Sequence, residues 1–235
     1  MVGRPDRSAN RRRARVRQPA APDLPADLTA ARLPDDDLKD GGVYLTLAFD
    51  DLDLSGRDAV NAEVDQCRYG NVNLSQSKLR RALIRDAVFE RCDLANLRAR
   101  ECSISRTTVT GSRMTGLSWV DGGVRDVTFT DCRMDLISFR QSTFKDVVFA
   151  GCRLEQADFG DADLSGARFD RCDLSGAQFS GARMTGTRLS GCDLTEITGV
   201  TSLRGAIITS ADAVPLAYML AKALGIVIED EDGQR

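Results

Sequence analysis

An apolar residue recurs at every fifth position over most of this chain. Steps of five from Phe49 reach Leu194 through thirty blocks without an insertion, and every block centre is apolar. All nine Phe and the single Trp occupy this register. A helix would scatter such residues, because five residues advance it by about 140° beyond a full turn. A flat strand would send alternate centres to opposite faces. The period therefore predicts a short extended stretch and a corner in every block, so the chain must wind into a coil.

The cysteines indicate how many blocks make one turn of that coil. All seven stand two residues before a block centre, and five of them share one phase of a period of twenty. Four blocks per coil follow, which predicts an all-β solenoid of square cross-section. Its predicted interior ladders contain Phe129, Phe149, Phe169, Leu154, Leu174, Leu194, Cys132, Cys152, Cys172 and Cys192.

Two further places of the block carry structural information. Glycine is frequent at the fifth place, where a corner with positive φ suits it. The first place is mostly small, but Leu97, Leu117 and Ile137 occupy it in the middle of the chain. Leu97 accompanies a small centre, Ala99, which conserves volume. Leu117 accompanies Trp119 without such compensation, so we expect that wall to bulge or bend.

The blocks also carry a family resemblance. The stretches ADLSG, CDLSG, ADFGD, CDLTE and CDLAN closely resemble the motif A(D/N)LXX of the bacterial pentapeptide-repeat proteins. The resemblance covers roughly residues 45 to 205 and implies a right-handed quadrilateral β-helix.

The register divides the chain into four parts. Residues 1–21 contain seven Arg, and this composition predicts a disordered basic tail, interpreted as a solubilising segment or a mis-assigned start. Residues 22–44 offer leucines as an N-terminal cap or lead-in, 45–205 form the β-helix, and 206–235 form a C-terminal helix, short strand and acidic tail. We expect the helix to begin near Ala211 with Ser210 as its N-cap, to end at Gly225, and to be followed by a strand from Ile226 to Ile228. We expect Leu216, Leu220 and Leu224 of this helix either to cover the end of the solenoid or to form a dimer interface.

The sequence argues against an enzyme. It has no histidine, which removes the commonest general base and the Ser-His-Asp and Cys-His nucleophile systems. An uninterrupted solenoid presents flat walls that exclude no water. Stacked cysteines would be about 4.8 Å apart, too far for a disulfide and too linear for a tetrahedral metal site. We therefore predict no catalytic residue, no metal site and no cofactor, with the cysteines acting as small buried apolar residues.

The densest like-charged group on the outside is the basic patch. It consists of Lys78, Arg80, Arg81, Arg98 and Arg100 on two successive coils. One interpretation is a solvated face neutralised by acids around the corner. The other is an interaction surface for a partner.

These observations predict that the protein is a non-enzymatic scaffold that interacts with an unknown protein partner. The resemblance implies an alternative, a DNA mimic that protects a type II topoisomerase such as DNA gyrase. However, residues 41–200 hold 23 acidic and 20 basic residues, far from the charge of a duplex. A third hypothesis is nucleic-acid binding through the basic N-terminal arm. We expect a cytoplasmic protein without membrane contact or small-molecule substrate, either a monomer or a homodimer through the C-terminal helix.

Overall fold

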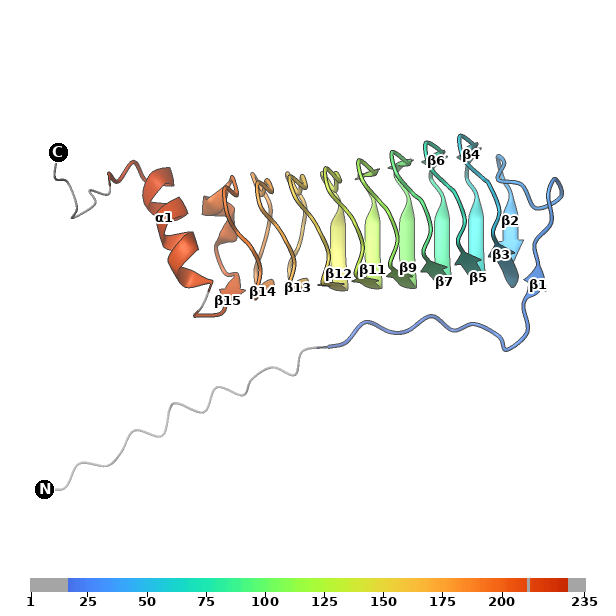
Figure 1. The fold of residues 1–235 in the computed structure, drawn as a ribbon, viewed down its shortest axis with the longest axis horizontal. Coiled ribbons are helices and arrows are strands. Elements are labelled where there is room, and N and C mark those ends of the chain that lie inside the picture. Colours follow the sequence, from blue (N-terminus) through green and yellow to red (C-terminus); the bar gives the residue numbers. More distant parts are fainter. Residues whose placement is uncertain (1–16, 211, 228–235) are drawn as a thin grey trace, which may run out of the picture.

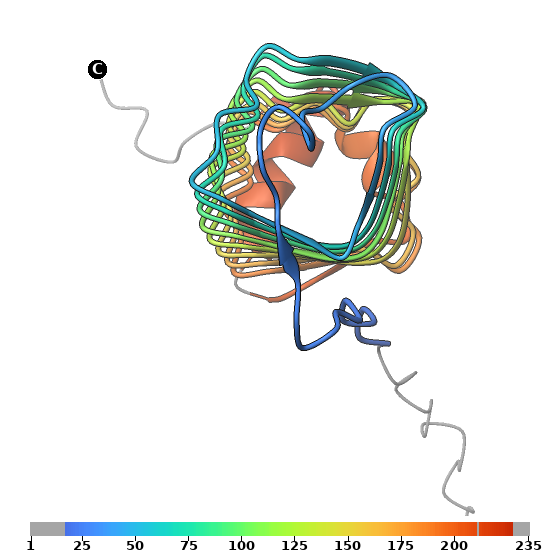
Figure 2. The same cartoon turned by 90° about the vertical axis from the view of Figure 1, so that its right-hand side faces the viewer.

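The computed structural model describes residues 17–210 and 212–227. The chain winds into a parallel β-solenoid of about nine turns. Its coils stack along one axis (Figure 1), and the view down that axis shows four walls around an interior (Figure 2). The predicted solenoid of square cross-section is therefore confirmed. Among the described residues, no helix has the length and apolar character needed to cross a bilayer.

The walls are built from short parallel strands. The larger sheet contains β1 (Thr29–Ala30), β2 (Val43–Leu45), β3 (Leu47–Asp50), β5 (Glu63–Gly70), β7 (Leu83–Glu90), β9 (Ser103–Thr110), β11 (Gly123–Thr130), β12 (Thr143–Ala150), β13 (Arg168–Asp170), β14 (Arg188–Ser190) and β15 (Ile207–Ile208). The smaller sheet, which we call the four-stranded wall, contains β4 (Asp58–Val60), β6 (Lys78–Arg80), β8 (Arg98–Arg100) and β10 (Ser118–Val120).

The pairing register confirms four blocks per coil. Phe129 pairs with Phe149 and Phe149 with Phe169, so partners in successive coils are twenty residues apart. The register changes only near the ends of the described chain, where Thr29 pairs with Leu47 and Leu189 with Ile208. These end segments extend the solenoid beyond the thirty sequence blocks.

The interior consists of stacked block centres. All centres from Phe49 to Leu194 are buried except Leu79 and Leu94, which are half-buried. Aromatic rings in adjacent coils stack almost parallel: the ring centroids of Phe149 and Phe169 are 4.8 Å apart at an interplanar angle of 5°. Each ring thus covers the face of the next, and burial of a single Phe side chain stabilises by about 1.5–3 kcal/mol.

The corners explain the fifth place of the block. Fifth-place residues have positive φ, whether glycine, as at Gly166 (φ 78), or not, as at Asp126 (φ 52). This left-handed conformation disfavours residues with a Cβ, and Asn and Asp tolerate it best after glycine. The many Asn, Asp and Gly residues at this place therefore follow from the turn geometry.

The first place of the block supplies hydrogen-bond donors to the interior. The Sγ of Cys152 donates to the carbonyl of Phe129 at 3.5 Å, and the Oγ of Ser142 donates to the carbonyl of Trp119 at 2.9 Å. Thr187 repeats the pattern with the carbonyl of Leu164. A small first-place residue with a hydrogen-bond donor therefore fills interior space and also satisfies a buried carbonyl. This role is more specific than the small buried apolar residue that we expected of the cysteines.

The strand register next to Trp119 limits the form that the expected bulge or bend of this wall can take. Within the described strands the pairing continues without an insertion, from Ala99 to Trp119 and from Ser118 to Ser138. Space for the indole comes from Gly122 at the first place of the next block, where a Cβ would overlap the indole Nε1 and lie 2.7 Å from Cδ1. The volume of the indole is therefore compensated across a corner without a change in register, and a bend of the wall stays a prediction.

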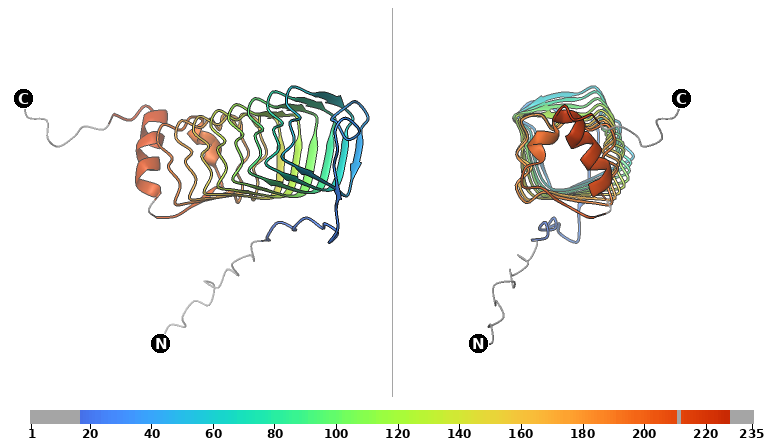
Figure 3. Two further views of the ribbon diagram at one scale, coloured as in Figure 1. Left: turned by 45° about the vertical axis from the view of Figure 1, so that its right-hand side comes forward. Right: turned by 90° about the vertical axis from the view of Figure 1, so that its left-hand side faces the viewer.

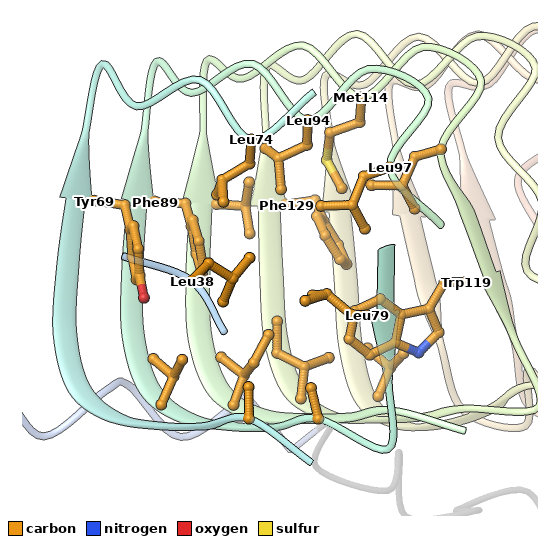
Figure 4. A pocket seen from close by; sticks show the side chains of 18 of the residues that line it. Leu38, Tyr69, Leu74, Leu79, Phe89, Leu94, Leu97, Met114, Trp119 and Phe129 are labelled. Carbon is orange, nitrogen blue, oxygen red and sulfur yellow. The ribbon is translucent and has the colours of Figure 1, made fainter. Parts of the chain in front are cut away.

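A small apolar cavity lies inside the N-terminal half of the solenoid. It has a volume of about 70 Å³ and is lined by apolar side chains. Figure 4 shows Leu79, Leu94 and Trp119 around it. Both half-buried leucines line this void. Because its lining has almost no polar groups, we expect it to be dry.

The C-terminal end is closed by a short helix. The 3-10 helix η1 (Val200–Leu203) continues the last coil, and α1 (Ala213–Ala223) lies across the open end of the solenoid (Figure 3). The helix begins at Ala213, close to the predicted start near Ala211, but Asp212 stands at the N-cap position, so the prediction of Ser210 as the cap is wrong. Ile226 and Val227 are not in a strand, and Ile228 lies outside the described residues.

At the opposite end, fewer leucines than expected contact the core. Leu38 packs against the core, whereas Leu33 is exposed. Tyr44 contributes instead: it is buried, its ring meets Phe49 edge-on at 6.1 Å, and its hydroxyl donates to the carbonyl of Asp37. The lead-in therefore seals the first coil through an aromatic residue that the sequence analysis had not assigned to this cap.

Candidate functional site: a basic patch and an acidic corner

The basic patch lies mainly on the four-stranded wall. Cross-strand register places Lys78 opposite Arg98 and Arg80 opposite Arg100, and Arg81 follows at the adjacent corner. All five side chains are exposed. Like charges directly opposite each other on one face of a sheet are destabilising. The structure therefore brings the predicted residues together in an arrangement that costs stability.

Acidic neighbours compensate only part of this charge. Lys78 pairs with Asp58 at 3.1 Å, and Arg100 lies 3.5 Å from Asp121. In the described part of the chain, Arg80 and Arg98 have no ion pair within 4.0 Å. Arg80 and Arg98 are diagonal neighbours on adjacent strands. Arg81, at the corner, donates to the neutral side chain of Asn61 and likewise has no ion pair within 4.0 Å among the described residues.

An arginine column on a different wall provides a contrast. Arg113, Arg133 and Arg153 also stack in successive coils. There, Arg113 pairs with Asp93 at 3.0 Å, and Asp135 lies within 4.0 Å of both other arginines. Every arginine of this column has a carboxylate partner. Uncompensated charge is therefore not a general consequence of stacking arginines in this fold.

The cysteines are interior residues of the solenoid. All seven cysteines are buried free thiols. Burial raises the pKa of Cys67, Cys92 and Cys102, so these thiols are protonated and poor nucleophiles at neutral pH. No group of three or more His, Cys, Asp or Glu side chains within the described ranges is arranged to hold a metal ion.

The three leucines of the C-terminal helix have different environments. Leu216 is buried against the last coil, whereas Leu220 is 38 % and Leu224 is 70 % exposed. Met219, rather than Leu220, also packs against the core. Leu216 and Met219 therefore form the covering face, and the other two leucines are exposed, as are Val214 and Tyr218.

A second charged feature, which sequence reasoning missed, is the acidic corner. It consists of Gln66, Asp86, Arg106, Asp126 and Asp146, the fifth-place residues of five successive coils. Asp86 is only 3 % exposed and Asp126 only 7 %. Both carboxylates would be poorly solvated without partners, which makes their contacts informative.

Residues 17–25, which we call the strap, lie along the acidic corner. The backbone N–H of Ala20 donates to Asp126 at 3.0 Å, and that of Asp23 donates to Asp86 at 3.0 Å. The side-chain amide of Gln66 donates to the carbonyl of Asp23 at 3.1 Å. In Figure 1 the strap runs beneath the coils toward β1, parallel to the solenoid axis.

Charged contacts complete this docking. Arg17 lies 3.4 Å from Asp146, and Arg168 donates to the side chain of Gln18 at 3.1 Å. The predicted disordered tail ended at residue 21, whereas residues 17–21 contact the solenoid. Residues 1–16 lie outside the described residues.

Arg106 is the one cation of the acidic corner, and it pairs with Asp86 in the preceding coil. Its Nε donates to the carboxylate at 2.7 Å, and its Nη2 makes a second, very short contact. The hydrogen bonds from Arg106, together with the strap N–H, lower the pKa of Asp86, while this same pairing raises the pKa of Arg106. Asp86 is therefore ionised and held by two different partners.

Comparison with known proteins agrees with the repeat geometry. Residues 123–198 match the family model described as the pentapeptide repeat region. Residues 123–198 of the chain are therefore a pentapeptide-repeat region. No curated protein matches this chain significantly.

Several solved pentapeptide-repeat structures are similar to the chain at low identity. HetL from the cyanobacterium Nostoc sp. strain PCC 7120, a protein involved in heterocyst differentiation regulation, is 21% identical, with 72% of this chain and 87% of HetL covered and a TM-score of 0.31. QnrB1, a plasmid-mediated fluoroquinolone resistance protein, is 18% identical, with 81% and 99% covered and a TM-score of 0.38. Rfr23 from the cyanobacterium Cyanothece 51142 is 13% identical, with 73% and 91% covered and a TM-score of 0.18.

Proposed function

We propose that this protein is a non-enzymatic scaffold that binds a partner protein through the basic patch. The observation that carries the proposal is the pair of like-charged cross-strand contacts, Lys78 with Arg98 and Arg80 with Arg100. Such contacts destabilise the free protein and become favourable when an anionic surface lies over them. The patch therefore fits a partner that presents carboxylates or other anionic groups.

The flat form of the patch supports recognition of a surface rather than a small molecule. Its strands lie in one sheet, and a surface hollow on this sheet is lined by Asp58, Val60, Lys78 and Arg80 with their two inward neighbours. Such a surface suits electrostatic association, in which charge complementarity accelerates encounter and excludes wrong partners.

The test is capture of partners by full-length protein. One variant combines Arg80→Ser, Arg98→Ser and Arg100→Ser with Arg81→Asn, because Arg81 has φ 53 and Asn tolerates that conformation. A control variant changes Arg113, Arg133 and Arg153 to Ser, which removes three arginines from the compensated column. We expect a partner of the wild type to be lost from the patch variant, to be retained by the control, and to dissociate at high salt. Equal capture by both variants would contradict the proposal.

Two alternatives predict different outcomes. A topoisomerase-directed DNA mimic would inhibit DNA supercoiling by purified gyrase and would lose this effect when outward carboxylates such as Asp161 and Asp173 are neutralised. We expect little inhibition, because the repeat region is nearly charge-balanced. A nucleic-acid-binding protein would retain duplex DNA at low salt and lose it when Arg11, Arg12 and Arg13 are replaced by Ser.

A further inference from the structure

The strap and the acidic corner have matching repeats. The two strap N–H groups that reach carboxylates belong to Ala20 and Asp23, three residues apart. Their acceptors, Asp126 and Asp86, are forty residues apart, which is two coils. Two coils extend about 9.6 Å along the axis at the usual spacing of parallel strands. Three residues of a polyproline II helix extend about 9.3 Å. One turn of such a helix therefore matches two coils of the solenoid.

The strap sequence has the composition that favours this conformation. Prolines occur at every third position, at Pro19, Pro22 and Pro25, within RQPAAPDLP. Pro19 and Pro22 are half-buried, whereas Ala20, Ala21 and Asp23 are exposed, so one face of the strap lies on the solenoid. Each of the two donors directly follows a proline. Proline thus fixes the extended backbone and presents the next N–H to a carboxylate.

Recognition at this corner depends on the backbone more than on side chains. Asp86 and Asp126 accept main-chain N–H groups, and Gln66 donates to a main-chain carbonyl. The side-chain contacts lie at the start of the strap, where Arg17 meets Asp146 and Asp126. Any extended segment with prolines three residues apart, followed by residues with a free N–H and preceded by a cation, offers the same groups.

We propose that the acidic corner is a binding site for an extended, proline-spaced segment of a partner protein, and that the strap is a built-in occupant which this segment displaces. This site lies apart from the basic patch, so the proposal does not depend on the patch having a partner. Charge complementarity supports a partner segment with a basic residue before its first proline, as Arg17 precedes Pro19. The strap competes at the high effective concentration of a tethered ligand, about millimolar for a short linker.

The test uses full-length protein and a fluorescent peptide of residues 17–27. In one variant, Ala20→Pro and Asp23→Pro remove both N–H donors of the strap and leave the solenoid unchanged. We expect the peptide to bind this variant at least about tenfold more tightly than the wild type, because the tethered competitor has lost its contacts. A peptide with the same two proline changes should not bind. Fluorescence anisotropy gives the affinities, and circular dichroism checks that each variant is folded.

The carboxylate contact is tested in the freed variant. Asp126→Gly removes one acceptor at a residue with φ 52, where glycine fits without strain, and should weaken peptide binding about tenfold. The matched control, Asp131→Gly, removes an exposed carboxylate at another corner with the same φ and should have no effect. Binding that is unchanged by Asp126→Gly would overturn the proposal, as would absence of binding to the freed variant.

A second measurement needs no variant. In the wild type, the amide protons of Ala20 and Asp23 should lose their protection from hydrogen exchange when millimolar unlabelled peptide is added. Protection that is unchanged at saturating peptide would contradict displacement. A concentration-dependent dimer that Asp126→Gly abolishes would identify the occupant as the strap of a second copy and would overturn a foreign partner.

Discussion

The indole of Trp119 packs over Gly122, so closely that a Cβ at residue 122 would also lie 2.8 Å from the backbone oxygen of Cys102. This contact crosses a corner between two walls. Because Gly122 has no side chain, the indole, which is the largest side chain in the protein, fits inside its coil without a change in the strand register.

Gly122→Ala should therefore destabilise the protein. The added methyl group must displace the indole or the backbone, and overpacking of this kind costs about 1–3 kcal/mol. Denaturant unfolding measures the change in the free energy of unfolding. Gly123→Ala is the matched control, since its Cβ would meet only the Oγ of Ser103 at 3.5 Å. Equal effects of the two substitutions would contradict the packing described.

The phenylalanine ladder should carry a large part of the stability. Phe159 is fully buried and stacks on Phe179 with ring centroids 5.4 Å apart. Phe159→Ala leaves a cavity and should lower the free energy of unfolding by about 3–5 kcal/mol. The neighbouring outward residue Gln178 is exposed, so Gln178→Ser should have little effect. Thermal unfolding monitored by circular dichroism distinguishes the two variants. An unchanged melting temperature for Phe159→Ala would contradict the stabilising role of the stacked phenylalanines.

The C-terminal helix should act as a cap through Leu216. Leu216→Asp places a charge against the last coil, and we expect a lower melting temperature and aggregation, because the end of the solenoid becomes exposed. Leu224 is exposed, so Leu224→Asp should leave the melting temperature of a monomer unchanged. If the helix instead forms a homodimer, sedimentation analysis will show the wild type as a dimer and Leu224→Asp as a monomer.

Low pH should release the strap. The pKa of Asp86 is lowered from 3.8 by Arg106 and by the strap N–H of Asp23, with Arg85 nearby adding a smaller effect. Because the pKa of Asp86 is lower in the docked state, its ionised carboxylate stabilises the contact with the strap at any pH above the ordinary pKa of an aspartate. This stabilisation is lost as the pH falls through the lowered pKa. Hydrogen exchange, corrected for its intrinsic pH dependence, should show stable protection of the Asp23 amide from pH 5 to 8 and loss below about pH 3.8. Loss of protection already near pH 6 would contradict this assignment.

The buried thiols should be unreactive until the protein unfolds. All seven cysteines are buried, and burial raises the pKa of Cys67, Cys92 and Cys102. Iodoacetamide at neutral pH should therefore leave the native protein unmodified and alkylate all seven residues in denaturant. Intact-mass measurement counts the adducts. Rapid labelling of any cysteine in the native state would show that its coil opens locally.

The five-residue repeat made the solenoid predictable from the sequence, whereas contacts that join different blocks could not be predicted from it. Phe159 and Cys152 could be assigned to the interior because their places in the block fix their direction. The fit of Trp119 to Gly122 was missed because each residue was compared with its own block, although the contact joins two blocks. The strap was missed for a different reason. Its prolines are visible in the sequence, but their match to Asp86 and Asp126 depends on the spacing between coils.

The uniform register also limits how proteins of this kind can change in length. Partners in the four-stranded wall, such as Leu79 and Ala99, are one full coil of twenty residues apart. Loss or gain of twenty residues would therefore keep every downstream side chain on its original face. A five-residue change would keep the apolar period and the fold but rotate all downstream faces by a quarter turn, so that Arg98 and Arg100 would no longer stand beside Lys78 and Arg80. Duplication of whole coils can lengthen such a protein while preserving a binding surface, whereas duplication of a single block creates a new one.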